Sequence, residues 1–203
     1  MFHRRARKVC TTDRSEAQVH QDIKEILYTQ SDIASRVEEL GKRITADYKD
    51  RMDSGERLVA VCLLRGAALF MADIVRHIEL PLEFDFMVVS SYGDSTTSSG
   101  TIRIQKDLSC DIEGANVLVI EDVIDSGFTL SYLCKNLLSR NPSSLEIASL
   151  LRKDVEGQAD VDCKYVGFEC PNEFIVGYGL DYAQRYRNLP YIGTLKPEVY
   201  TNE

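Results

Sequence analysis

The sequence predicts an α/β protein in which helices flank a parallel-sheet core, and three observations support this fold class. Two segments, Leu58 to Leu64 and Val117 to Ile120, are unbroken apolar runs without the alternation of a half-exposed strand. An unbroken apolar run is typical of a strand that is covered on both faces. Each run leads through a glycine turn into a segment with apolar residues at helical spacing. Strand-like and helix-like segments then alternate along the chain, which favours parallel strands joined by helical crossovers.

Length, charge and cysteine usage narrow the class of protein. The 203 residues suit one domain with a small appended subdomain. A net charge of −8 argues against binding a nucleic-acid backbone, which requires clustered lysine and arginine. No apolar stretch approaches the ~20 residues of a membrane-spanning helix. The six cysteines are scattered without the spacing of a zinc site, so we expect free thiols in a reducing, cytoplasmic location.

The chain begins with a basic segment, residues 1 to about 15, which we expect to be a mobile arm. Polar residues follow its basic start where a signal peptide would have an apolar core. Ile23 to Leu27 is a short mixed run that fits an edge strand. A helix then begins at Thr29 or Ser31, and its apolar residues recur at spacings of four and three: Ile33, Val37, Leu40, Ile44 and Tyr48.

The apolar run Leu58 to Leu64 is followed by Arg65-Gly66-Ala67, which opens the next helix. Free backbone N–H groups at a helix N-terminus attract anions, and Arg65 adds a cation. This turn is therefore a candidate phosphate site, although an ordinary strand-to-helix turn has the same appearance.

Alternating apolar residues from Leu82 to Val88 predict a strand with one buried face. A polar run from Ser90 to Gly100 follows, and Tyr92 is its one residue of a core-forming type. A loop of this kind is either a hairpin tip or a lid that closes over a reaction and excludes water. Thr101 to Ile104 would return as the second strand, so the candidate lid covers about residues 90–104.

The central segment, Val117 to Leu130, combines a buried strand, an acidic pair and a short loop that opens a helix. In parallel sheets, ligands bind beyond the carboxyl ends of the strands, where loops meet helix N-termini. Gly127 can adopt the dihedral angles of a tight turn, while Ser126 and Thr129 offer hydroxyl groups. The segment therefore predicts a phosphate pocket.

Three carboxylates, Glu121, Asp122 and Asp125, lie beside this predicted pocket. They would repel a phosphate unless a divalent metal or sugar hydroxyl groups lay between them. Glu121 and Asp122 would face opposite ways on a strand, so both can serve one ligand only where the strand has ended. The alternative is a solvated loop in which Asp125 or Ser126 only caps the next helix.

In the last third of the chain, Leu145 to Leu151 predicts another core strand, which ends at Arg152-Lys153. Two short apolar segments, Val161 to Phe168 and Phe174 to Val176, suit a small subdomain over the sheet. We expect this hood to consist of the N-terminal edge segment and about residues 154–203.

The pattern E-D-V-I-D-S-G-x-T at residues 121–129 resembles the phosphoribosyl-diphosphate signature of the type I phosphoribosyltransferases, specifically of the hypoxanthine–guanine branch. The segments LLRK (150–153) and VGFECPNEFIVGYGLDY (166–182) match the same family. The resemblance extends from about Ile23 to Ile192-Gly193 and is closest to the shorter, bacterial-type enzymes. It implies the type I phosphoribosyltransferase fold, with residues 16–203 as the domain, a hood and a flexible lid.

The resemblance also implies roles for individual residues. Asp125 is the catalytic residue and transfers a proton at purine N7. The remaining implied roles are 5′-phosphate binding by Asp125, Ser126, Gly127, Phe128 and Thr129; pyrophosphate binding by Arg65, Gly66, Ser91, Tyr92 and Arg187; ribose and metal binding by Glu121 and Asp122; and purine binding by Lys153, Phe174, Ile175 and Asp181, with Asp181 also a ligand of a second Mg2+. Leu64-Arg65 corresponds to a peptide bond that is often cis in the family.

The implied reaction belongs to purine salvage: a 6-oxopurine displaces pyrophosphate from phosphoribosyl diphosphate, giving IMP or GMP. The Lys153 ammonium is donor-only, so it suits a 6-oxo group and opposes the amino group of adenine. Family members are usually dimers or tetramers, so we also expect a homo-oligomer. The alternative is a regulator of the same fold that senses phosphoribosyl diphosphate and binds RNA or DNA; it would require a basic face, which this acidic chain does not show.

Overall fold

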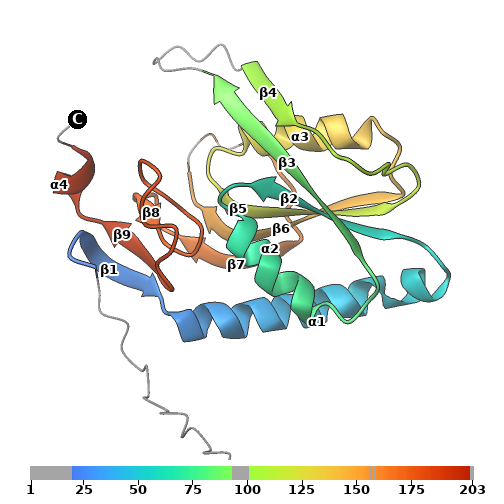
Figure 1. Cartoon of the computed structure of the whole chain (residues 1–203), viewed down its shortest axis with the longest axis horizontal. Coiled ribbons are helices and arrows are strands. Elements are labelled where there is room, and N and C mark those ends of the chain that lie inside the picture. Colours follow the sequence, from blue (N-terminus) through green and yellow to red (C-terminus); the bar gives the residue numbers. More distant parts are fainter. Residues whose placement is uncertain (1–19, 93–100, 156, 158, 202–203) are drawn as a thin grey trace, which may run out of the picture.

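The computed structural model describes residues 20–92, 101–155, 157 and 159–201. The predicted arm at residues 1–15 and the tip of the predicted lid, residues 93–100, lie outside these ranges. The first element within these ranges is β1 and the last is α4 (Figure 1).

A six-stranded sheet in the order β4-β3-β2-β5-β6-β7 forms the centre of the fold (Figure 1). Five neighbouring strands of this sheet, β3, β2, β5, β6 and β7, run parallel to one another. At one edge, β4 pairs antiparallel with β3. The strands are β2 (Leu58–Leu64), β3 (Glu83–Tyr92), β4 (Thr101–Lys106), β5 (Asn116–Ile124), β6 (Ser144–Lys153) and β7 (Tyr165–Cys170). The predicted α/β class with a parallel core is confirmed.

Helices cover both faces of this sheet. On one face lie α1 (Gln30–Asp53), α2 (Ala68–Ile74) and the short 3-10 turn η1 (Val75–His77), and on the other lies α3 (Phe128–Leu138) (Figure 1). Thr29 caps α1: its side chain accepts a hydrogen bond from the Asp32 N–H, and the Asp32 carboxylate accepts one from the Thr29 N–H at 2.9 Å. The predicted start of this helix at Thr29 or Ser31 agrees with the cap. None of the helices in the described ranges is long and apolar enough to cross a membrane.

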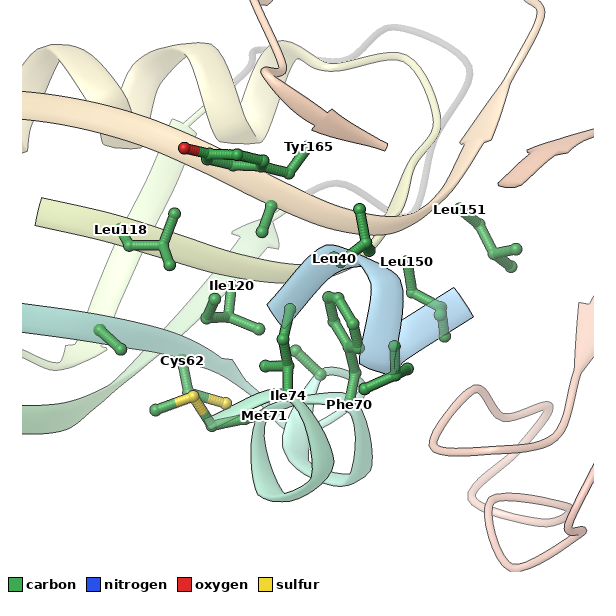
Figure 2. Packing of buried hydrophobic residues seen from close by; sticks show 14 of the residues in the cluster. Leu40, Cys62, Phe70, Met71, Ile74, Leu118, Ile120, Leu150, Leu151 and Tyr165 are labelled. Atoms are coloured by element: carbon green, nitrogen blue, oxygen red, sulfur yellow. The ribbon is translucent and has the colours of Figure 1, made fainter. Parts of the chain in front are cut away.

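The two faces of each central strand contribute to separate apolar clusters. Figure 2 shows the cluster under α1 and α2, where Leu40, Phe70 and Ile74 from the helices pack on strand residues such as Cys62, Ile120 and Leu150. The other face packs Val59, Val117 and Val119 against Leu130, Leu133 and Leu137 of α3. Burial on both faces explains why β2 and β5 read as unbroken apolar runs.

A second, three-stranded antiparallel sheet forms the hood in the order β1-β9-β8. It contains β1 (Ile23–Tyr28), β8 (Ile175–Val176) and β9 (Ile192–Leu195), followed by the short helix α4 (Pro197–Tyr200). The predicted edge strand near Ile23 is therefore present, and it pairs with the far end of the chain.

Two predicted boundaries differ from the structure. The segment around Tyr165, assigned to the hood, forms β7 and pairs with β6 in the central sheet, because the exposed edge of β6 offers it unpaired backbone groups. The central strand also continues past Ile120 to Ile124 and so includes both Glu121 and Asp122. Local composition does not determine which sheet a short strand joins or where its pairing ends.

Asp85 of β3 holds the segment that follows the return strand of the predicted lid. Its buried carboxylate accepts hydrogen bonds from the N–H groups of Phe86 (2.7 Å), Cys110 (3.0 Å) and Ser109, and from Lys106 Nζ (3.3 Å). Burial alone would raise the pKa of this carboxyl group, but these donors together hold its pKa below the ordinary value.

We therefore expect Asp85→Asn to lower the free energy of unfolding by about 1–3 kcal/mol at pH 7, because a charged acceptor is lost from a buried site. A carboxyl group whose pKa is lower in the folded state stabilises above its unfolded pKa, about 3.9, and this contribution is lost as the pH falls through the folded value. Urea unfolding at pH 7 and at about pH 3 should show the difference from wild type shrinking in acid. Glu113→Gln, at an exposed site in the same region, is the control. A difference that stays constant with pH would contradict this account.

Candidate active site

A cavity of about 400 Å³ opens at the carboxyl ends of β2, β3 and β5. Parallel α/β sheets bind ligands at this edge. The residues that line it come from the central sheet, from two loops and from the hood: Leu63, Leu64, Arg65, Gly66, Val88, Val89, Ser90, Gln105, Glu121, Asp122, Thr129, Asp181 and Arg187. Residues more than a hundred positions apart thus meet in one polar cleft.

The loop after β2 is confined between the sheet and the hood. The Leu64–Arg65 peptide bond is cis, as the resemblance implies. A Cβ atom on Gly66 would lie 1.6 Å from Asp122 Oδ2, and one on Gly179 would lie 2.1 Å from the Gly66 carbonyl oxygen. No other residue fits at either position without displacing its neighbours, so the loop is stacked directly on the Asp122 carboxylate.

Glu121 and Asp122 both line this cavity, although they are consecutive residues of a strand. The Asp122 N–H donates to Glu121 Oε1 at 3.0 Å. Burial raises the pKa of Glu121 well above its usual range, and the neighbouring Asp122 charge raises it further. The strand end expected before these residues is not found, because β5 continues to Ile124, and both residues line one cavity from within the strand.

The cavity offers carboxylate oxygens to a hard cation, from Glu121, Asp122 and Asp181. Within the described ranges, no three His, Cys, Asp or Glu side chains converge closely enough to hold a metal by themselves. Mg2+ is commonly bound through one or two carboxylates together with substrate phosphates and water, so this donor set fits Mg2+. A cation beside Glu121 would also offset the Asp122 charge, which adds to the effect of burial in raising the Glu121 pKa.

The loop between β5 and α3 has the geometry of an anion site. Gly127 adopts a left-handed conformation (φ 74°) at the start of α3, and the Ser126 carbonyl accepts a hydrogen bond from the Ala159 N–H at 2.8 Å. Gly127 is the N-cap of α3 and Phe128 and Thr129 are its first residues, so their N–H groups have no partner within the helix. These donors are therefore available to a phosphate group at the helix N-terminus.

Asp125 follows β5 directly, and Lys153 is the last residue of the adjacent parallel strand β6, in which Arg152 pairs with Ile124 of β5. Their side chains form an ion pair, with Lys153 Nζ 2.9 Å from Asp125 Oδ2. The Lys153 side chain is 13% exposed, whereas that of Asp125 is 55% exposed. The structure thus places a shielded ammonium group against an accessible carboxylate beside the loop at residues 126–129.

The hood contributes Asp181 and Arg187 to the cavity. Arg187 Nη2 lies 2.7 Å from Asp181 Oδ1, and Arg187 Nη1 donates to the Gly179 carbonyl at 2.7 Å. The Gln184 N–H donates to Asp181 Oδ2 at 2.8 Å. The backbone is left-handed at Tyr178 and at three residues after Asp181, namely Ala183, Gln184 and Tyr186. Backbone strain of this kind concentrates at functional sites.

Other predicted site residues lie outside the cavity lining. Phe174 is 39% exposed and packs on Tyr182 and Tyr200 within the hood, while Ile175 is buried in the core between sheet and hood. Phe128 is 62% exposed on α3. For Ser91 and Tyr92 the structure gives the backbone pairing of β3 with β4, and their side chains lie outside the described part.

Ser90 belongs to the candidate lid, but the sequence assigned no role to it or to the other cavity residues from β3 and β4: Val88, Val89 and Gln105. The Gln105 side-chain amide donates a hydrogen bond to the Ser90 hydroxyl oxygen at 3.0 Å. The polar sequence of the lid was the available signal, and it gave no reason to prefer these residues to their neighbours.

The fold and this cleft define a phosphoribosyltransferase. Residues 25–183 match the family described as phosphoribosyl transferase domain, and the chain belongs to this family. Among curated relatives, hypoxanthine-guanine phosphoribosyltransferase of Mycobacterium tuberculosis is 54% identical over 180 residues, 88% of this chain and 89% of the relative. The enzyme of the same name from Bacillus subtilis is 51% identical over 179 residues, 88% of this chain and 97% of the relative.

Solved structures give the same result. The crystal structure of a hypoxanthine phosphoribosyltransferase from Staphylococcus aureus superposes with a TM-score of 0.84 at 50% identity, covering 90% of this chain and 97% of that chain. The family predicted from the motif at residues 121–129 is therefore confirmed.

Proposed function

We propose that this protein is a purine salvage enzyme that transfers the 5-phosphoribosyl group of phosphoribosyl diphosphate to hypoxanthine and guanine. The products are IMP or GMP and pyrophosphate. The observation that carries the proposal is the single cleft that combines the acidic pair Glu121 and Asp122, the 65–66 loop and the hood residues Asp181 and Arg187. The relatives named for this activity are similar over most of the chain, and a nucleic-acid-binding regulator is not favoured.

The donor is held by its charged groups. The available N–H groups of residues 126–129, with the hydroxyls of Ser126 and Thr129, receive the 5′-phosphate at the N-terminus of α3. Asp125 and Phe128 belong to the same loop. Glu121 and Asp122 accept hydrogen bonds from the ribose hydroxyl groups, since ionised carboxylates are acceptors only.

The leaving pyrophosphate lies between the 65–66 loop and the hood. Arg65 and Arg187 supply positive charge, and Gly66 supplies a backbone N–H. The family resemblance assigns Ser91 and Tyr92 of the predicted lid to the same group. Two Mg2+ ions would be held by Glu121 and Asp122 on one side and by Asp181 on the other, and would neutralise charge on the leaving group. Because the whole protein carries a net charge of −8, attraction of this anion depends on these local groups.

The purine binds next to the Asp125–Lys153 pair. Lys153 donates to the 6-oxo group, Ile175 offers backbone groups to the base edge, and Phe174 stacks on the ring. In the direction of transfer, Asp125 accepts the N7 proton as a purine ring nitrogen forms its bond to C1 of the ribose and the C1–O bond to pyrophosphate breaks. The ribose carries oxocarbenium character as pyrophosphate leaves, by analogy with glycosyl transfer.

The test is an assay of pyrophosphate release with hypoxanthine, guanine, xanthine and adenine at fixed donor and Mg2+ concentrations. We expect turnover with hypoxanthine or guanine and a kcat/KM for adenine lower by several orders of magnitude, since Lys153 and the adenine amino group are both donors. Equal rates with adenine would exclude the assigned role of Lys153. A gel-shift titration with RNA and DNA in parallel tests the regulator, and binding there without turnover would replace the proposed function.

We also propose a cytoplasmic homo-oligomer, either a dimer or a tetramer. The thiols of Cys62, Cys110, Cys134, Cys163 and Cys170 are free, which suits a reducing compartment. Sedimentation analysis at several protein concentrations measures the assembly state.

A further inference from the structure

The ring of Phe174, which the proposed function places against the purine, contacts two other aromatic rings of the hood. It stacks on the ring of Tyr200, with centroids 5.2 Å apart and 27° between the planes. Tyr182 meets the same ring almost perpendicularly, at 5.1 Å and 85°. The face that Tyr200 covers cannot receive a base, so a stacked purine has to use the surface of Phe174 that remains exposed.

The backbone around Phe174 is tied to both ends of the described chain. Its carbonyl accepts a hydrogen bond from the Leu195 N–H at 2.9 Å, just before α4 begins. Glu173 pairs with Lys24 of β1, with Lys24 Nζ 3.0 Å from Glu173 Oε2. These contacts fix the backbone but not the side-chain rotation of Phe174, which is restrained by the neighbouring rings.

We propose that Tyr200 in the C-terminal helix α4 is a positioning residue for purine binding. It holds the Phe174 ring in the orientation that accepts the base. This inference rests on the proposed function. A ring that is already fixed loses less conformational freedom when the purine arrives, so preorganisation strengthens binding without any direct contact. Aromatic pairs of this geometry contribute enough to change an affinity by about three- to tenfold.

The experiment compares steady-state kinetics of wild type, Tyr200→Ala and Tyr200→Phe with hypoxanthine and phosphoribosyl diphosphate. Tyr200→Ala should raise the KM for hypoxanthine about three- to tenfold, because the Phe174 ring becomes free to rotate. Its kcat and its KM for phosphoribosyl diphosphate should stay at wild-type values. Tyr200→Phe retains the ring and should restore the KM for hypoxanthine.

A matched control separates stacking from loosening of α4. Val199, the preceding residue, packs against the apolar cluster of the hood, so Val199→Ala weakens the docking of the same helix without touching the ring pair. An equal rise in the hypoxanthine KM in Val199→Ala, or no rescue by Tyr200→Phe, would overturn the inference in favour of a merely structural role. Tyr200→Leu, which keeps apolar bulk without a ring, replaces Tyr200→Ala if that variant does not fold.

The two hypotheses fail in different ways. A wild-type enzyme that transfers no phosphoribosyl group to any 6-oxopurine would overturn the proposed function and this inference together. An active Tyr200→Ala variant with an unchanged KM for hypoxanthine would overturn the inference and leave the proposed function intact.

Discussion

Replacing Asp125 by asparagine should lower kcat by about 10²- to 10⁴-fold, the usual range for loss of a general acid or base. An amide cannot hold the proton that the carboxylate exchanges with purine N7. The Asp125 side chain is accessible and its carboxylate lies 2.9 Å from Lys153 Nζ, so the group is already placed at the proposed base site. The KM values for both substrates should change much less than kcat, since asparagine keeps the shape of the side chain.

Initial rates over a matrix of hypoxanthine and phosphoribosyl diphosphate concentrations measure this effect. Asp154→Asn, at an exposed carboxylate immediately after Lys153, is the matched control and should behave like wild type. If Asp125→Asn instead retains kcat and raises a KM, Asp125 contributes to binding and has no part in proton transfer.

The second large effect is expected from Lys153→Gln. Hydrogen bonds to a charged donor contribute about 1.5–3 kcal/mol, so kcat/KM for hypoxanthine should fall about 10- to 150-fold. Glutamine also presents an acceptor oxygen, which can meet the amino group of adenine. The ratio of kcat/KM for hypoxanthine to kcat/KM for adenine should therefore fall by a larger factor than kcat/KM for hypoxanthine itself. Competition between the two bases in one reaction measures this preference directly.

Arg152→Gln provides the control for loss of a cation at this strand end. Arg152 precedes Lys153 but pairs with Glu169, and both side chains are exposed on the surface. Its replacement should leave the base preference unchanged. Should Lys153→Gln reduce activity equally with both bases, Lys153 would act only by orienting Asp125, and the selectivity would have another origin.

The local parts of the site could be predicted from the sequence because they depend on neighbouring residues. Unbroken apolar runs identified β2 and β5, and the glycine turns after them located two helix N-termini. The left-handed Gly127 and the cis peptide at Leu64–Arg65 lie where the sequence and its family resemblance placed them. Such features depend on backbone sterics and side-chain periodicity over a few residues.

Long-range pairing could not be predicted in the same way. The segment from Tyr165 to Cys170 has the composition of a short strand in either sheet, and only the open edge of β6 assigns it to the central one. In the hood, β1 pairs with β9, residues near opposite ends of the chain. Pairings of this kind depend on which edges remain unpaired after the core has formed.

By itself, the sequence of this protein determined the strand–turn–helix units, the acidic pair beside the Gly127 turn and the family to which they belong. Only the tertiary structure decided that Asp181 and Arg187 share a cleft with Glu121 and Asp122, that Lys153 meets Asp125, and that Tyr200 stacks on Phe174. Local structure follows from interactions along the chain, whereas these contacts join residues distant in sequence and depend on how the strands pair and how the hood packs on the carboxyl edge of the sheet.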